Sequence, residues 1–466
     1  MADQSGINSR VDKKSVLFVF TLSSFLTPFM GASTNIALPS IGKEFSMNAV
    51  LLGWVASSYL LTASIFLVPF GKIADMYGRK KIFLWGISIY CGGCLLCGIA
   101  WSSASLLAFR VIQGLGGSMI FGTGVAILTS VFPAGERGRA MGIAVSAVYL
   151  GLSCGPIFGG LLTQHLGWRS IFLINLPLVF IIIAIILWKI KGDWTGAKGD
   201  RFDAVGSAIY SVMLFCLMYG FSRLPSKLGF GLIAIGAIGA AAFYKWEITT
   251  EHPVLEMDLF RKNAVFAFSN LAALINYSAT SAVGFLLSLY LQYVKGMSPQ
   301  SAGLVLVSQP IVMAVFSPQA GKLSDRIEPR IVASAGMALD VIGLALFCFL
   351  SEGSGLVFII VGQMILGLGF ALFSSPNTNA VMSSVQKEYL GVASSTLGTM
   401  RLTGQMFSMG IAMLVFSLYL GDLHITPETH GRFLAGARTM FIVFMILCCC
   451  GVGFSLIRGR IHRKMD

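Results

Sequence analysis

The chain has 466 residues, of which 56% are hydrophobic and only 11% are charged. Soluble domains usually carry about 25% charged residues, so this composition excludes a large soluble protein. The formal net charge of +13 would suggest a nucleic-acid partner in a soluble protein, but in a membrane protein the positions of the charges decide. We therefore expect a protein that spans the lipid bilayer with helices and binds no nucleic acid.

Fourteen apolar stretches are long enough to cross the bilayer, which takes about 20 residues of helix. They lie at residues 15–38, 48–71, 82–101, 104–131, 139–163, 169–190, 203–222, 228–245, 263–293, 299–320, 331–350, 354–376, 390–420 and 435–457. The first stretch exceeds the roughly 7 to 15 apolar residues of a cleavable signal, so we predict an uncleaved first helix. The predicted fold class is an all-α polytopic membrane protein.

Lysine and arginine are unevenly distributed among the predicted loops. Most of them fall in the tails and the even-numbered loops, and few fall in the odd-numbered loops. Positive charge is retained on the cytoplasmic side of a membrane. We predict a multi-pass protein of the plasma (cytoplasmic) membrane, a monomer with both termini in the cytoplasm.

Two short sequences recur about 250 residues apart, a kind of internal repeat that is expected in secondary transporters. GKIAD at Gly71 returns as GKLSD at Gly321, and GLG at Gly114 returns as GLG at Gly367. The repeat predicts two six-helix bundles with two helices inserted between them. The predicted units are an N-terminal bundle at 1–190, the inserted helices with their linkers at 191–262, and a C-terminal bundle with a tail at 263–466.

The segment that begins at Gly71 reads GKIADMYGRKK and closely resembles the loop signature of the major facilitator superfamily. Gly71 and Gly78 would permit a tight turn, and Asp75 would accept from a helix N-terminus or pair with Arg79. The resemblance implies that this loop, which includes Lys80, is a latch that braces one half of the protein against the other.

Two further signatures follow at matching places. RVIQGLG at Arg110 resembles the embedded arginine motif of the superfamily, and GLSCGPIFGG at Gly151 is similar to the antiporter motif of drug exporters. With fourteen helices, these motifs narrow the resemblance to the fourteen-helix drug/proton antiporters.

The antiporter motif has a physical interpretation of its own. Its glycines repeat every four residues and form a smooth stripe for a neighbouring helix, and its proline bends the axis. The motif residues are Gly151, Gly155, Pro156, Gly159 and Gly160. Such a kinked stripe suits a sliding contact, although static packing of small residues has the same pattern.

Transport against a gradient needs an energy source, and the chain has no Gly-x-x-x-x-Gly-Lys phosphate loop for ATP. We therefore expect no cofactor and a proton gradient as the driving force. All five histidines fall in predicted loops or tails, and Asp340 is the only carboxylate deep in a predicted helix. A buried carboxylate retains a proton, and a nearby cation favours its release. Asp340 is thus a candidate for proton coupling, or alternatively a structural partner of a polar group.

Two arginines lie within predicted helices, where each costs at least about 2.5–3.5 kcal/mol. Arg110 should therefore face a cavity or a partner. The resemblance implies a role for it in proton coupling or gating, and the alternative is an arginine that backbone carbonyls and Gln113 satisfy for packing alone. Arg401 is a second candidate for coupling or gating, and Gln363 occupies the position of Arg110 in the second half. Many drug exporters of the type that this chain resembles carry an aspartate in the first helix, and this chain has Met30 at that position. If both arginines face inward, the cavity is positive and favours anionic or neutral substrates over lipophilic cations.

Neutral polar and aromatic side chains within the predicted helices are candidates for substrate contacts, although such residues also serve helix packing. They are Asn35, Trp54, Tyr59, Gln113, Asn276, Tyr290, Gln309 and Asn379. No grouping of acids, histidines and cysteines predicts a metal site or a membrane-embedded enzyme.

The sequence therefore predicts a proton-coupled secondary active transporter that exports drugs or other small amphiphilic molecules by alternating access. Its partners would be a small-molecule substrate, protons and the lipid bilayer. The alternatives are an exporter of organic anions or lipid-like molecules, and an uncoupled facilitator or sensor of the same fold.

Overall fold

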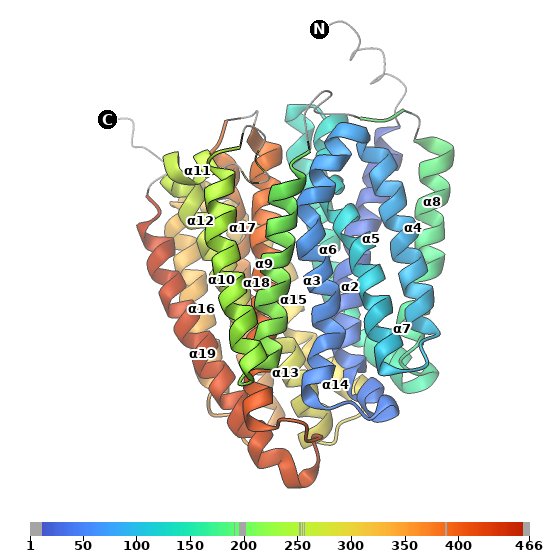
Figure 1. The fold of residues 1–466 in the computed structure, drawn as a ribbon, viewed down its shortest axis with the longest axis vertical. Helices are drawn as coiled ribbons and strands as arrows, with labels where there is room; N and C mark the ends of the chain where they lie inside the picture. Colours follow the sequence, from blue (N-terminus) through green and yellow to red (C-terminus); the bar gives the residue numbers. More distant parts are fainter. Residues whose placement is uncertain are drawn as a thin grey trace, which may run out of the picture.

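The computed structural model describes residues 12–190, 192–194, 202–250, 253, 255, 257–386 and 389–459. His252, His462 and much of the predicted linker after residue 190 lie outside this part of the chain. The described helices run side by side along the long axis of Figure 1. Both the first and the last helix have their chain-terminal end at the top of Figure 1. We call this the terminal end of the bundle, and the opposite one the far end.

Fourteen spans within the described residues are long and apolar enough to cross a membrane, which confirms the predicted number. The first six spans are built from α2 (Lys13–Phe45), α3 (Ala49–Tyr77), α4 (Arg79–Gly98), α5 (Ser103–Val131), α6 (Ala134–Leu166), and the pair α7 (Ser170–Leu173) and α8 (Asn175–Lys189). Side-chain caps define several starts; Asn48 Oδ1, for example, accepts from the backbone N–H of Leu51 at 2.9 Å.

Three of the remaining eight spans consist of more than one helical segment, namely Ala264–Val294, Pro299–Arg326 and Pro427–Ile457. The inserted helices are α9 (Ala204–Arg223) and α10 (Lys227–Glu247), followed by the short α11 (Met257–Lys262). The second half contains α12 (Ala264–Thr280), α13 (Val283–Leu289) and the π-helical η1 (Tyr290–Val294), then α14 (Pro299–Leu306), α15 (Ser308–Arg326), α16 (Pro329–Phe347), α17 (Leu356–Ser383), α18 (Leu390–Tyr419), η3 (Pro427–Thr429) and α19 (His430–Ile457).

The sequence repeat is also a repeat of packing. A Cβ atom at Gly116 in α5 would lie 2.7 Å from the carbonyl oxygen of Gly86 in α4, and one at Gly369 in α17 would lie 2.7 Å from that of Gly336 in α16. In both halves the backbones of these two helices therefore lie so close together that only glycine fits at the contact. The third and fourth helices of each half cross in the same way.

The inserted helix α9 contacts both halves, through α3 and α18. Methionines fill the contact with α18: Met218 Sδ of α9 lies 3.2 Å from the position of a Cβ at Gly410, and Met406 and Met413 of α18 belong to the same buried cluster. Trp54 of α3, a predicted substrate contact, is partly exposed and packs against Tyr219 of α9, with ring centroids 6.0 Å apart. The helix α10 packs chiefly against α9.

Candidate functional site

At the far end, a proline in α2 creates a hydrogen-bond acceptor for the other half. Pro39 has no N–H, so the carbonyl of Asn35, four residues earlier, has no partner within the helix. Ser288 Oγ of α13 donates to this carbonyl at 2.6 Å, and Gln292 Nε2 of η1 donates to the carbonyl of Ile36 at 2.9 Å. The kinked end of α2 is thereby bound to the second half.

The antiporter motif lies beside this junction and serves two interfaces. Its stripe packs on α2: a Cβ at Gly151 would lie 2.5 Å from the carbonyl oxygen of Phe25, and one at Gly159 would lie 2.7 Å from Ser33 Cα. Ser33 Oγ also donates to the carbonyl of Gly155 at 3.0 Å. This part of the motif belongs to the N-terminal half alone.

The end of the motif faces the other half. A Cβ at Gly160 would lie 2.5 Å from the carbonyl oxygen of Pro299 in α14, and a Cβ at Gly303 of α14 would collide with the carbonyl of Pro156. Further contacts join the halves at the far end: Asn48 donates to Asp422, and Gln164 and His165 both bond to Gln300. The structure is therefore a conformation whose far end is closed.

At the terminal end, the predicted latch is only partly a loop. Gly71 lies inside α3, which continues to Tyr77, so the turn expected at Gly71 is wrong; Gly78 alone breaks the helix, with φ +116°. Arg79 Nε donates to Asp75 Oδ1 at 2.6 Å, which is one of the two arrangements expected for this carboxylate. Arg79 also bonds to the carbonyl of Ala126 and to Ser130 of α5. These contacts stay within the N-terminal half.

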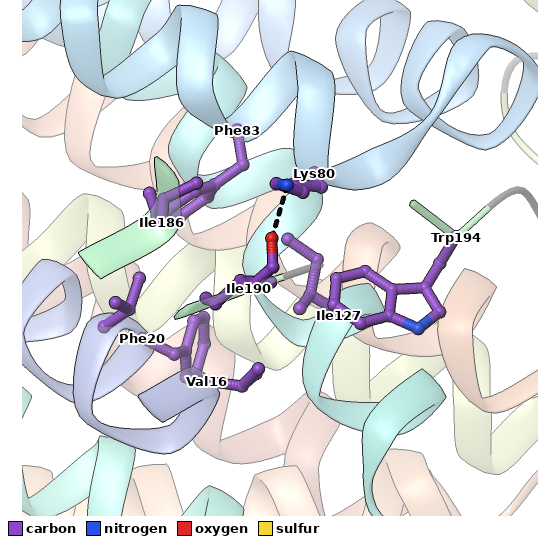
Figure 2. Close-up of a pocket in the computed structure, with 9 residues that line it drawn as sticks. Val16, Phe20, Lys80, Phe83, Ile127, Ile186, Ile190 and Trp194 are labelled. Carbon is purple, nitrogen blue, oxygen red and sulfur yellow. Dashed lines mark hydrogen bonds between the residues drawn. The ribbon is translucent and has the colours of Figure 1, made fainter. Parts of the chain in front are cut away.

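The segment after α8 supplies a hydrogen-bond acceptor for the first turn of α4, which has no acceptor from its own N-cap side chain. The N-cap residue of α4 is Gly78, which has no side chain, and Asp193 Oδ1 accepts from the backbone N–H of Lys80 at 2.9 Å. The N–H of Arg79 donates to the carbonyl of Trp194 at 2.9 Å. Figure 2 shows Lys80 bonded to the carbonyl of Ile190, beside an apolar pocket that Trp194 also lines. The latch is thus fastened to the start of the linker.

Asp193→Ala is expected to accelerate hydrogen exchange of the amides in the first turn of α4 about fivefold, because loss of an N-cap acceptor costs about 1 kcal/mol. Asp193→Asn keeps an acceptor oxygen and is the matched control, which should exchange like wild type. Exchange mass spectrometry of the peptide that contains Lys80 measures both. An alanine variant with unchanged exchange would show that Asp193 does not cap this helix.

Arg110 lies in a closed site inside the N-terminal half. Its Nε donates to the carbonyl of Val55 at 2.9 Å and its Nη1 donates to Gln113 Oε1. The guanidinium carbon lies 4.8 Å from the ring centroid of Tyr59 and 5.9 Å from that of Phe172. Only 2% of the side chain is exposed. In this conformation Arg110 therefore faces partners within its own half, namely the carbonyl of Val55 and the side chain of Gln113.

Most of the predicted substrate contacts lie between helices of one half. Gln113 is fully buried and donates to Cys94 Sγ at 3.0 Å, and Tyr59 lies under Arg110. Tyr290 is fully buried, and its hydroxyl donates to the carbonyl of Ser351 at 2.7 Å. Asn379 Nδ2 donates to Ser324 Oγ at 3.1 Å near the terminal end. In this conformation Tyr59, Gln113 and Tyr290 are buried, whereas Asn379 is partly exposed.

Four of the eight predicted contacts keep some exposure, and Trp54 and Asn379 are two of them. Asn35 and Gln309 are both partly exposed. Their carbonyls, however, are used in packing, since Asn35 O accepts from Ser288 and Gln309 O lies 2.5 Å from the position of a Cβ at Gly367. Only their side chains are available to a ligand.

Asp340 is fully buried at mid-depth in the C-terminal half. Its Oδ2 accepts from Asn276 Nδ2 of α12 at 2.8 Å, and its Oδ1 is enclosed without a hydrogen-bond partner among the described residues. Neither arginine predicted to act with it makes an ion pair to it. Asp340 occupies the position that Tyr90 holds in the first half. The backbone nitrogen of Asp340 lies 2.8 Å from the position of a Cβ at Gly369, and that of Tyr90 lies 2.4 Å from the position of a Cβ at the equivalent Gly116. An ionised carboxylate in this site would lack a counter-charge.

Arg401 of α18 has a different environment from Arg110. It is partly exposed, its Nη2 donates to Thr378 Oγ1 at 2.5 Å, and its guanidinium carbon lies 5.8 Å from the ring centroid of Tyr277. Its Nε is enclosed without a partner among the described residues. Of the two embedded arginines, Arg110 is buried and Arg401 is partly exposed.

Sequence reasoning missed the aromatic cluster next to Arg401 and a buried arginine beyond the last span. The cluster contains Tyr149, Tyr277, Met313 and Phe370, whose spacing along the chain gives no signal. Arg458, assigned to the tail, is 1% exposed, and its Nη1 donates to Asn377 Oδ1 at 2.8 Å. Burial lowers the pKa of the Arg458 guanidinium to about 10.

A family model described as Major Facilitator Superfamily matches residues 20–246 and 270–464. The chain belongs to the major facilitator superfamily. Its fold and family are therefore those of membrane transporters, as the three motifs predicted.

Relatives in this superfamily include several named transporters. The chain is 30% identical to the riboflavin transporter RibZ of Clostridioides difficile (strain 630), over 85% of this chain and 86% of that protein. It is 32% identical to the multidrug resistance protein Stp of Mycobacterium tuberculosis (strain CDC 1551 / Oshkosh), over 85% of this chain and 74% of that protein. The tetracenomycin C resistance and export protein of Streptomyces glaucescens is 28% identical, over 83% and 73%.

Solved structures share the fold at low sequence identity. The peptide transporter POT in complex with sulfate has a TM-score of 0.70 and 14% identity, covering 98% of this chain and 100% of the other. A bacterial homologue of the human lysosomal transporter Spinster, in an inward-facing and unoccupied conformation, has a TM-score of 0.65 and 18% identity, with 96% of each chain covered. These likenesses place the fold among transporters of the major facilitator type.

Proposed function

We propose that this protein is a proton-coupled exporter of small amphiphilic molecules that works by alternating access in the plasma membrane, with the terminal end in the cytoplasm. The observation that carries the coupling is the site of Asp340. This carboxylate is fully buried, and its only hydrogen-bond partner among the described residues is the neutral Asn276. Burial of an unpaired ionised carboxylate costs several kcal/mol, so Asp340 holds a proton in this conformation and releases it when water reaches the site.

The closed far end supports the alternating-access part of the proposal. The bonds from Ser288 and Gln292 to α2, and the approach of α14 to Gly160, hold the halves together there. Export requires that this contact break while another forms at the terminal end. The substrate class is supported by the relatives, whose names include multidrug resistance and the export of tetracenomycin C.

The test is transport in proteoliposomes with an acidic lumen and an alkaline exterior. Protons leaving the lumen are expected to drive accumulation of ethidium, or of the anion pyrenesulfonate, against its own gradient. Dissipating the pH gradient with an ionophore should stop accumulation without changing the protein. Passive equilibration of both probes, with or without the gradient, would instead identify an uncoupled facilitator.

A second candidate substrate class is suggested by one relative and one cluster. RibZ is named a riboflavin transporter, and riboflavin is a planar aromatic molecule. The cluster that contains Tyr149, Tyr277 and Phe370 offers aromatic side chains next to Arg401. Labelled riboflavin belongs in the same transport assay for this reason.

A further inference from the structure

Arg401 has donor capacity that the described protein does not use. Its Nη2 donates to Thr378 Oγ1, its Nε is enclosed without a partner, and its Nη1 donates to no described residue and is not enclosed. No carboxylate of the described residues forms an ion pair with it. A guanidinium has five N–H donors in a planar fork that matches carboxylate, sulfonate and phosphate groups. The site therefore lacks an acceptor of this type.

The comparison with Arg110 shows what an arginine used for packing looks like in this protein. Arg110 is 2% exposed, bonds to Val55 and Gln113, and is enclosed by two aromatic rings. None of its nitrogens is enclosed without a partner. Arg401 differs in both respects, since it is partly exposed and incompletely bonded.

The surroundings of Arg401 are aromatic rather than acidic. Tyr277 lies 5.8 Å from the guanidinium carbon and meets Phe370 edge to face, with ring centroids 5.3 Å apart. Tyr149 and Met313 complete this cluster. The three rings are 7–9% exposed, so the cluster is buried but not sealed. Ring faces and a polarizable sulfur favour a flat aromatic ligand.

The cluster joins the two halves of the protein at mid-depth. Tyr149 comes from α6 of the N-terminal half, whereas Tyr277, Met313 and Phe370 come from α12, α15 and α17 of the C-terminal half. Any rocking of one half against the other must separate Tyr149 from the rest. A ligand held here would experience that motion directly.

We propose that Arg401, with the Tyr277–Phe370 cluster, binds planar aromatic anions, the guanidinium taking the carboxylate, sulfonate or phosphate and the rings taking the aromatic plane. This names the substrate class of the exporter and, for its role in transport, rests on the proposed function. It also distinguishes the substrate from the lipophilic cations that many drug exporters expel.

Riboflavin and riboflavin 5′-phosphate are the probes for this site, because they share one aromatic ring system and differ by a single anionic group. Binding to purified protein in lipid nanodiscs is measured by quenching of flavin fluorescence, without any pH gradient. Wild type is expected to bind the phosphate about tenfold more tightly than riboflavin, as a charge-assisted hydrogen bond would provide. Arg401→Gln should abolish this preference and leave riboflavin binding within about twofold. Tyr277→Leu should weaken both probes, and Tyr277→Phe should weaken neither.

Arg438→Gln is the matched control, since Arg438 is an exposed arginine on α19. It should bind both flavins like wild type, and equal thermal midpoints of all variants exclude misfolding. Equal affinity of wild type for the two flavins, no binding of either, or a retained preference in Arg401→Gln would each overturn the proposal. The preference for the phosphate could depend on Arg401 while a pH gradient drives no transport. That pair of results would overturn the proposed coupling and still support the proposed binding site.

Discussion

Asp340→Asn is expected to abolish substrate accumulation driven by a pH gradient while preserving exchange of substrate across the membrane. Asparagine has the shape of a protonated aspartate and can still accept from Asn276 Nδ2, whose bond to Asp340 Oδ2 is 2.8 Å long. It cannot take up or release a proton. The protein should therefore fold and alternate but no longer couple the two fluxes.

Two measurements on the same proteoliposomes separate these effects. Gradient-driven accumulation should fall to the level of empty liposomes, whereas counterflow of labelled against unlabelled substrate should remain within about twofold of wild type. Asp258→Asn is the control, because Asp258 is exposed at the start of α11 and its one ion-pair partner among the described residues is Lys262. Normal accumulation in the Asp340 variant would make this residue structural, which is the alternative that the sequence left open.

Gly160→Ala is expected to shift the protein toward conformations in which the far end is open. The added Cβ would lie 2.5 Å from the carbonyl oxygen of Pro299 and 2.9 Å from Gln300 Cα, and both of these atoms are backbone. Forcing such a contact costs roughly 1–3 kcal/mol, which changes the ratio of two conformations about tenfold. The cost applies only while α6 and α14 are in contact, so the open state escapes it.

Hydrogen exchange of α13, η1 and α14 measures this shift, because these segments lose their contacts with α2 and α6 when the far end opens. Their amides should exchange faster in Gly160→Ala than in wild type. Gly142→Ala is a matched control on the same helix, since nothing lies within 4 Å of a Cβ at Gly142. Equal exchange in wild type and both variants would refute a gating role for this end of the antiporter motif.

The fold could be predicted because its signals are local in the sequence. An apolar stretch must be helical in lipid to satisfy its own backbone groups, so counting such stretches gave fourteen spans. The ends of the helices were less predictable, because polar helical turns extend beyond the apolar region. This is why Gly71 was expected in a loop and lies in α3.

The candidate site was less predictable than the fold. A polar residue in an apolar stretch shows that its burial costs free energy, but it does not show which neighbouring helix its side chain faces. Arg110 and Arg401 look alike in sequence, yet one is enclosed by Tyr59 and Phe172 and the other is partly exposed. Their difference depends on which neighbouring helices approach, and these come from distant parts of the chain. The same reason hid the cluster of Tyr149 with Tyr277, whose residues are brought together only by the contact of the two halves.

The contacts of α9, α18 and α3 contain several methionines. Met218 of α9 contacts Gly410 of α18. The Sδ atom of Met413 in α18 lies 3.3 Å from the position of a Cβ at Gly53 in α3. An unbranched side chain with three rotatable bonds can change shape at little cost while it stays in contact. Met218 at the contact of α9 with α18, and Met413 at the contact of α18 with α3, can therefore stay packed when these helices shift slightly.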